Sequence, residues 1–174
     1  MHQKLEIKDQ TKRKPVKSAK MRTVEPLPGV AVDVPNWEIR WAQSADITNF
    51  VRIEKDCLED NAWSISRFRD ALQKSKCSAH VCCDPDTADV VGFVLHRNNQ
   101  QNVEIIRLVV AAGYRRQKIG TSLVNRLHNR ASKNREIVSV AVPERLLTMQ
   151  LFFQSLGFRA TQIVKNADPL LDDD

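Results

Sequence analysis

Residues 104–130 read Glu-Ile-Ile-Arg-Leu-Val-Val-Ala-Ala-Gly-Tyr-Arg-Arg-Gln-Lys-Ile-Gly-Thr-Ser-Leu-Val-Asn-Arg-Leu-His-Asn-Arg, and this stretch decides the fold. Its first part, up to Val110, is rich in β-branched residues, which is typical of a buried strand. From Ile119 onward apolar residues recur at every fourth position, which predicts an amphipathic helix. The turn between them is basic, and the first amides of a helix have no partner inside it. Such a turn is suited to binding a phosphate-bearing ligand, whereas the alternative is an exposed basic turn that binds nothing.

The basic turn resembles the phosphate loop of the GNAT superfamily, the acetyl-CoA-dependent N-acetyltransferases. The family loop reads R/Q-x-x-G-x-G/A, and the corresponding residues here are Arg115, Arg116, Gln117, Lys118, Ile119 and Gly120. The resemblance implies that the amides from Arg116 to Thr121 hold the pyrophosphate of acetyl-CoA. Lys118 replaces the first glycine of the family loop, a residue that permits unusual dihedrals and a close approach of the backbone. We expect the lysine ammonium to compensate by contacting a phosphate.

The elements around this loop follow the GNAT order from Trp37 to about Val164. Periodicity and turn residues predict β-α-α-β-β-β-α-β-α-β. The expected segments are strands at 37–41, 79–83, 90–96, 104–110, 137–142 and from 158, and helices opening at Ser44 and Ser64 and spanning 119–134 and 146–156. We therefore expect a single α/β domain of GNAT type. Its mixed central sheet has about six strands flanked by four helices, with a V-shaped splay after the fourth strand.

The splay is expected within the central strand. Arg107 interrupts the apolar run there, as a β-bulge would. In GNAT proteins a bulge at this point separates two parallel strands, and the pantetheine arm enters the gap. The resemblance implies that the backbone of Leu108, Val109 and Val110 pairs with pantetheine. An amide near Val109 or Val110 would polarise the thioester carbonyl.

Side-chain chemistry departs from the family pattern. The tyrosine that protonates the departing thiolate in many members corresponds to Phe153, and an asparagine that contacts the cofactor corresponds to Leu146. The glutamate base of ribosomal-protein alanine acetyltransferases corresponds to Ala141. Glu104 precedes the loop by the spacing of the base glutamate in histone-type acetyltransferases, and its apolar neighbours would raise its pKa, so it is the candidate catalytic base. The alternative is a strand-end carboxylate that faces solvent or pairs with Arg107.

Two aromatic positions have weaker interpretations. The Trp63-Ser64 step resembles the same point in ribosomal-protein alanine N-acetyltransferases and other N-terminal acetyltransferases. The alternative, which we favour, is that Trp63 is a core or hinge aromatic residue. His96 ends a strand beside Arg97 and is expected at the surface.

The charge distribution sets the domain limits. Residues 1–22 hold eight Lys/Arg against Glu6 and Asp9, so 8 − 2 = +6 equals the net charge of the whole chain. We expect a basic disordered tail and Pro-rich linker at 1–36, the acetyltransferase domain at 37–166 and an acidic tail at 167–174. The basic tail would contact ribosome, nucleic acid or another acidic partner, or nothing specific.

Composition excludes several classes of protein. An apolar share of 42% with 28% charged residues is ordinary for a soluble globular chain. The sequence has no apolar run of membrane-spanning length and no secretory signal, so no membrane partner is expected. The four cysteines form no C-x-x-C pair and no histidine pair has metal-ligand spacing. We therefore expect a reduced, cytoplasmic protein with no metal.

The chain after Phe158 has room for about one strand, whereas the family usually adds a seventh. We expect the segment Val30–Val34, or a second subunit in a homodimer, to cover the open edge. The predicted function is transfer of an acetyl group from acetyl-CoA to a primary amine by direct attack in a ternary complex. The acceptor remains open among a protein N-terminus, a lysine and a small amine. The alternative is a weak or inactive GNAT-like module that senses CoA or associates with ribosome or nucleic acid.

Overall fold

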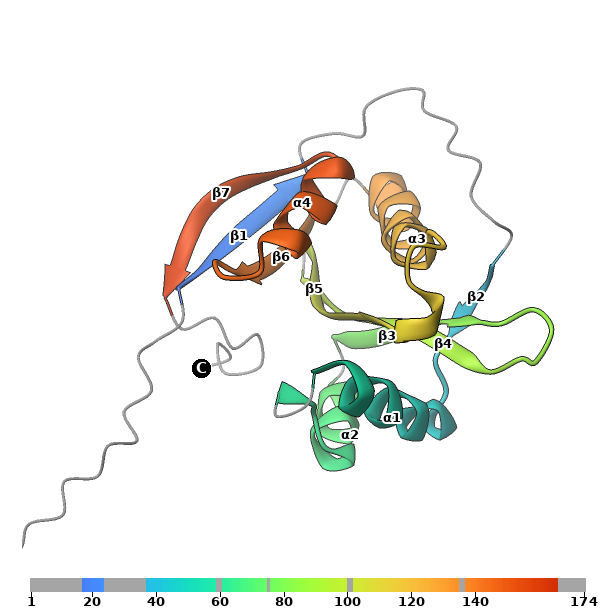
Figure 1. Ribbon diagram of the computed structural model, residues 1–174. Coiled ribbons are helices and arrows are strands. Elements are labelled where there is room, and N and C mark those ends of the chain that lie inside the picture. Colours follow the sequence, from blue (N-terminus) through green and yellow to red (C-terminus); the bar gives the residue numbers. More distant parts are fainter. Residues whose placement is uncertain are drawn as a thin grey trace, which may run out of the picture.

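A seven-stranded sheet forms the centre of the molecule (Figure 1). The computed structural model describes residues 17–23, 37–58, 61–74, 76–99, 102–134 and 137–165. The strand order is β2-β3-β4-β5-β6-β1-β7. In chain order the elements are β1 Lys17–Thr23, β2 Glu38–Trp41, η1 Ser44–Asp46, α1 Ile47–Leu58, α2 Ile65–Gln73, β3 Cys77–Cys83, β4 Val90–Asn99, β5 Asn102–Val110, η3 Ala112–Tyr114, α3 Ile119–Asn134, β6 Ile137–Pro143, α4 Leu147–Ser155 and β7 Phe158–Lys165.

Helices lie on both faces of the sheet, and each face has its own core. Figure 1 shows α1 and α2 on one side of the β3–β5 region and α3 on the other. The predicted stripe of α3 is confirmed, since every fourth residue from Ile119 to Ala131 is buried in the α3-side core. On the other face three phenylalanines pack together, with the Phe50 and Phe93 rings stacked at 4.2 Å. None of the described helices is long and apolar enough to cross a membrane.

The sheet opens between β5 and β6. β5 pairs with β4 as far as Val110, but its parallel pairing with β6 stops at Ile105. The β4–β5 register shifts at the same place, because Leu95 faces Arg107 while His96 faces Ile105. Ile106 is therefore the extra residue of a bulge, one position before the predicted interruption. The predicted splay after the fourth strand of the domain is confirmed, and it leaves one edge of residues 107–110 unpaired with β6.

The seventh strand comes from a segment that we predicted to be disordered. β1 lies between β6 and β7 and pairs antiparallel with both. The disorder prediction is therefore wrong for residues 17–23, and the fold includes residues before Trp37. A strand paired on both edges satisfies its main-chain groups without a hydrophobic period, which the sequence argument had required. The chain itself thus fills the place assigned to Val30–Val34 or to a second subunit, and Val30–Val34 lies outside the described residues.

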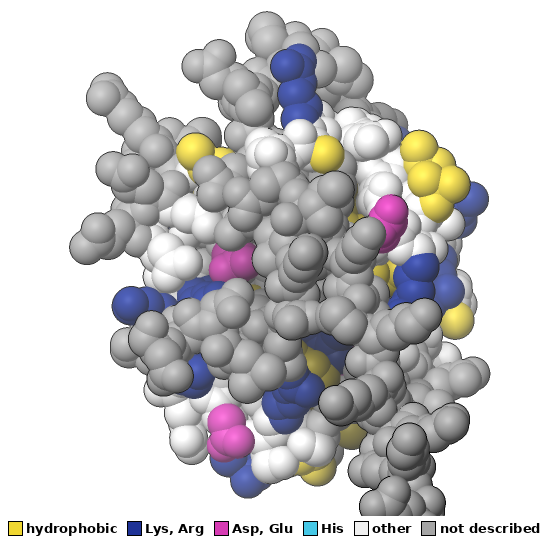
Figure 2. All heavy atoms as spheres, turned by 90° about the vertical axis from the view of Figure 1, so that its left-hand side faces the viewer, with side chains coloured by type: hydrophobic (Ala, Val, Ile, Leu, Met, Phe, Trp, Pro, Cys, Tyr) yellow, Lys and Arg dark blue, Asp and Glu magenta, His cyan; other side chains and the backbone are white. Residues whose placement is uncertain are grey.

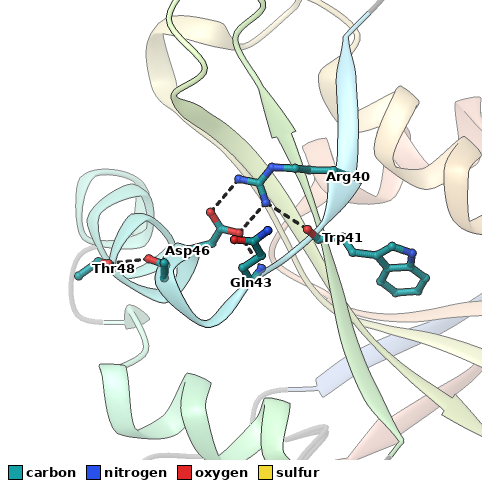
Figure 3. A network of polar contacts seen from close by, with 6 residues as sticks. Arg40, Trp41, Gln43, Asp46 and Thr48 are labelled. Atoms are coloured by element: carbon teal, nitrogen blue, oxygen red, sulfur yellow. Dashed lines mark hydrogen bonds and ion pairs between the residues drawn. The ribbon is translucent and has the colours of Figure 1, made fainter.

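A polar network fixes the turn from β2 into α1 (Figure 3). The Arg40 guanidinium donates to both carboxylate oxygens of Asp46, at 2.8 and 3.0 Å. The Gln43 amide donates to the same carboxylate at 2.7 Å, so Asp46 caps the turn and Ser44, the predicted cap, does not. Burial raises the pKa of Asp46, but the Arg40 and Gln43 hydrogen bonds outweigh it, and the pKa lies below its usual value.

Candidate functional site

The open half of β5 presents backbone groups to the gap. The Val109 carbonyl oxygen lies beside Gly92 of β4, since a Cβ added at Gly92 would be only 3.2 Å from it. The Ala111 amide donates to the Val91 carbonyl of β4 at 2.9 Å. Val109 and Ala111 therefore direct their backbone groups toward β4. Because backbone groups alternate along a strand, those of Leu108 and Val110 are directed toward the gap. Two of the three residues predicted to pair with pantetheine thus have suitable backbone orientation, and Val109 does not.

The loop between β5 and α3 has an unusual backbone. Arg116 and Lys118 have φ angles of 65° and 61°, in the left-handed region. Lys118 therefore adopts the conformation that the family glycine would supply, at a cost of about 1 kcal/mol. The first hydrogen bond of α3 runs from the Ser122 amide to the Lys118 carbonyl. The amides of Ile119, Gly120 and Thr121 precede that bond and have no acceptor within the helix.

Neighbouring elements hold this loop in place. The Trp37 indole N–H donates to the Gln117 carbonyl at 2.9 Å, which ties the loop to the start of β2. The Arg115 Nε donates to the Val110 carbonyl at 3.3 Å. The Tyr114 hydroxyl is hydrogen-bonded to the carboxylate of Asp84, in the β3–β4 turn, and this bond raises the pKa of Tyr114. Three hydrogen bonds, to the Trp37 indole, the Val110 carbonyl and the Asp84 carboxylate, thus hold the loop that contains the left-handed turn.

The loop is positively charged and its helix end is open. Arg115, Arg116 and Lys118 are exposed, and the first turn of α3 contains no acidic residue. A Cβ added at Gly120 would lie 3.2 Å from the Phe152 ring, so this ring borders the loop on the α4 side. Free amides, a positive helix end and three cations together form an environment that can bind a diphosphate.

Figure 2 views the molecule from the side of β1 and β7. Among the charged side chains that are coloured in this view, Lys and Arg outnumber Asp and Glu. Positive charge of this kind favours the approach of anionic groups.

Glu104, the predicted base, lies in the closed half of β5. It is 8% exposed and forms an ion pair with Arg97 of β4, with 3.0 Å between Nη2 and Oε2. The predicted alternative partner, Arg107, is instead directed toward α1. Ser139 of β6 faces Glu104 in the parallel register and is fully buried.

The positions corresponding to the family acid and asparagine carry no polar side chain. Phe153 is fully buried and packs edge-on against Phe158, with centroids 5.0 Å apart. Leu146 precedes α4 and is exposed. Ala141 lies in β6. None of these three side chains can donate or accept a proton.

Sequence reasoning missed Glu54 of α1. This glutamate is fully buried, accepts from the Trp63 amide at 2.6 Å and forms an ion pair with Arg107, with 3.0 Å between Nε and Oε1. The signal was present in the sequence, because Glu54 lies four residues after Phe50 and four before Leu58 on the apolar face of the helix. Trp63 is buried beside it, as the core interpretation predicted.

Metal-binding residues do not cluster in the described part of the chain. No group of three or more His, Cys, Asp or Glu side chains there could hold a metal ion. The four cysteines are free thiols, and three of them are buried.

Comparisons with known proteins agree with this geometry. The model of the acetyltransferase (GNAT) family matches residues 41–158. A GNAT-family protein from Novosphingobium aromaticivorans has a TM-score of 0.67 at 14% identity, over 86% of this chain and 62% of that one, so the chain spans less than two thirds of its length. The ribosomal-protein-S18-alanine N-acetyltransferase from Escherichia coli has a TM-score of 0.65 at 18% identity, and the match covers 72% of this chain and 79% of that one. Ard1 from Thermoplasma volcanium has a TM-score of 0.64 at 19% identity, and the match covers 72% of this chain and 84% of that one. At these identities the likeness concerns the fold. No curated protein matches the sequence.

Proposed function

The chain belongs to the GNAT acetyltransferase family, and we propose that it transfers an acetyl group from acetyl-CoA to a primary amine by direct attack in a ternary complex. The observation that carries the proposal is the left-handed backbone at Lys118, next to the unpaired half of β5. A lysine adopts this conformation at a cost, and the neighbouring contacts maintain it. The result is a loop of GNAT type despite the missing glycine.

The loop and the gap bind different parts of the donor. The amides from Arg116 to Thr121 hold the pyrophosphate, and the side chains of Arg115, Arg116 and Lys118 add positive charge. Gln117, Ile119 and Gly120 contribute through their backbone. The backbone groups of Leu108 and the amide of Val110 pair with the pantetheine arm, since the Val110 carbonyl already accepts from Arg115 and Cys57. One of their amides donates to the thioester oxygen as negative charge develops there.

Proton transfer relies on Glu104. The attacking amine must be neutral, because an ammonium group has no lone pair, and Glu104 accepts its proton directly or through water. The thiolate leaves without a dedicated acid, since a free thiol has a pKa of about 8.5 and water can protonate it. Phe153 therefore does not prevent turnover.

The acceptor that suits this site best is a protein N-terminus. An α-amine has a pKa of about 7.7–8.0 and a lysine amine one of about 10.4, so at neutral pH far more of the α-amine is neutral. Glu104 is also ion-paired with Arg97, so the better acceptor is the amine that has the larger neutral fraction and depends least on proton removal by Glu104. The fold likeness to an alanine N-acetyltransferase supports the same choice. We further propose a reduced cytoplasmic setting, with the basic residues before β1 directed at ribosome or another acidic partner.

Release of free thiol from acetyl-CoA tests this proposal. We expect release with a peptide that has a free N-terminus, much less with the same peptide N-acetylated and carrying an internal lysine, and none without peptide. Glu104→Gln should lower kcat at neutral pH by about a hundredfold or more. Full turnover by that variant would remove Glu104 from the mechanism.

The second candidate is a CoA-binding module without turnover, favoured by the apolar residues at Phe153 and Leu146. It predicts that acetyl-CoA binds but that no amine in a panel of peptides, lysines and polyamines releases thiol.

A further inference from the structure

One buried carboxylate joins three separate elements beside the split. Glu54 of α1 accepts from the backbone amide of Trp63, in the α1–α2 connection, at 2.6 Å. Its two oxygens also contact Arg107 of β5, with 3.0 Å from Nε to Oε1 and 3.2 Å from Nη2 to Oε2. The same Nη2 donates to the Asn61 carbonyl at 2.8 Å. We call Glu54, Asn61, Trp63 and Arg107 the Trp63 clamp.

The indole ring strengthens this clamp. The Arg107 guanidinium lies 4.5 Å from the Trp63 ring centroid, and that of Arg67 lies 4.4 Å from it. A cation at this distance from an indole is attracted by its π-system. Arg107 is thereby oriented both by the carboxylate and by the ring, which a more flexible cation would not reproduce.

Glu54 is held at an energetic cost. Burial raises its pKa, and the Trp63 amide and Arg107 offset only part of this effect. The carboxylate is therefore protonated at a higher pH than an exposed glutamate, and protonation weakens its contact with Arg107.

The clamp acts on the part of β5 where the donor is held. Arg107 directly follows the bulge at Ile106, where pairing with β6 has ended. Cys57, one turn after Glu54 on α1, places its thiol 3.5 Å from the Val110 carbonyl. Helix α1 thus contacts both ends of the unpaired segment, whose Leu108 and Val110 backbone groups are directed toward the gap.

The clamp lies on the face of the sheet opposite α3. Helix α3 packs on one face of β5, and α1 and α2 pack on the face that carries Trp63 and Arg107. We propose that Glu54 and Arg107 are positioning residues, which align the α1–α2 connection with the split so that the amine meets the thioester carbon. This inference rests on the proposed acetyl transfer, and neither residue touches the reacting atoms.

Arg107→Lys is the main test, because it keeps the charge but loses the planar, two-point contact. Arg69→Lys, an exposed arginine of α2 outside the clamp, is the matched control. The quantities to compare in the wild type and both variants are kcat, the KM for the acceptor, the calorimetric Kd for acetyl-CoA and the hydrogen-exchange rate of the Trp63 amide. We expect faster exchange, a kcat lower by about tenfold to a hundredfold and a nearly unchanged Kd in Arg107→Lys, and wild-type values in the control.

The pH profile adds a readout that a purely structural role would not move. Wild-type kcat should fall as acid protonates Glu54 and the base Glu104. Glu54→Gln should have a lower kcat and an acid limb from which the contribution of Glu54 is missing. Should either variant fail to fold by circular dichroism, Trp63→Phe, which keeps the backbone amide, supplies the same comparison. Wild-type kinetics in Arg107→Lys despite faster exchange at Trp63 would overturn the positioning role alone. A wild-type protein that transfers no acetyl group would overturn the proposed function together with it.

Discussion

The pair His80 and His96 makes the fold acid-sensitive. Both side chains are buried in the sheet on the α3 side, with ring centroids 5.4 Å apart, and Trp41 stacks on His80 at 4.0 Å. Burial, with the charges of Arg126 and Arg130, lowers the pKa of His80 from 6.5 to about 4. Burial, with His80 and Arg130, lowers the pKa of His96 to about 3.

These pKa values fix the sign and size of the effect. The unfolded chain binds a proton at each ring below about pH 6.5, whereas the folded chain binds none until about pH 4 or lower, so acid favours unfolding. At about pH 5 each ring costs on the order of 2 kcal/mol, and the pair about 4 kcal/mol. A domain of ordinary stability, about 5–15 kcal/mol, loses a large part of it. Above about pH 6.5 neither ring changes the stability.

Urea unfolding followed by circular dichroism, between about pH 7.5 and pH 5, measures this loss. The comparison protein is His80→Phe/His96→Leu, which removes both titrating rings and keeps buried apolar volume. His128, whose pKa burial also lowers, is common to both proteins and cancels in the difference. We expect the wild type to lose about 4 kcal/mol more than the double variant. Equal losses in the two proteins would refute the reasoning.

Three further predictions concern the sheet and its turns. Deletion of residues 1–23 exposes the edges of β6 and β7 and should lower the melting temperature by about 10 °C or more, whereas deletion of 1–16 spares β1 and should not. Gly92→Ala brings a Cβ to 3.2 Å from the Val109 carbonyl, which the strand cannot move aside, and should cost about 1–3 kcal/mol in urea unfolding. Arg40→Ala leaves the buried Asp46 carboxylate without its partner and should cost about 2 kcal/mol, while unchanged stability would show that the Gln43 amide suffices.

The sequence predicted the parts of the molecule that follow a period or a loop motif. The α3 stripe from Ile119 to Ala131 and the splay near Arg107 are both present, because each depends on local pattern and burial. The left-handed turn was harder to predict from Lys118 alone. Its conformation depends on contacts from distant segments, including the Trp37 indole on the Gln117 carbonyl.

Three features required knowledge of the register. β1 has no apolar period, and its place between β6 and β7 follows from main-chain pairing. His96 was expected at the surface, but it is buried. Strand β4 lies between β3 and β5, and the His96 side chain is on the face that α3 covers. Glu104 pairs with Arg97 because these residues face each other across β4 and β5, while Arg107 is held by Glu54 of α1.

Calorimetric titration of acetyl-CoA at neutral pH tests the central claim, that the left-handed turn at Arg116 and Lys118 leaves the first amides of α3 open to a diphosphate. We predict one-to-one binding with a Kd on the order of micromolar, retained in Lys118→Gly and weakened about tenfold or more in Lys118→Glu. A wild-type protein that shows no binding heat, or that binds only after Lys118 is replaced by glycine, would contradict the account.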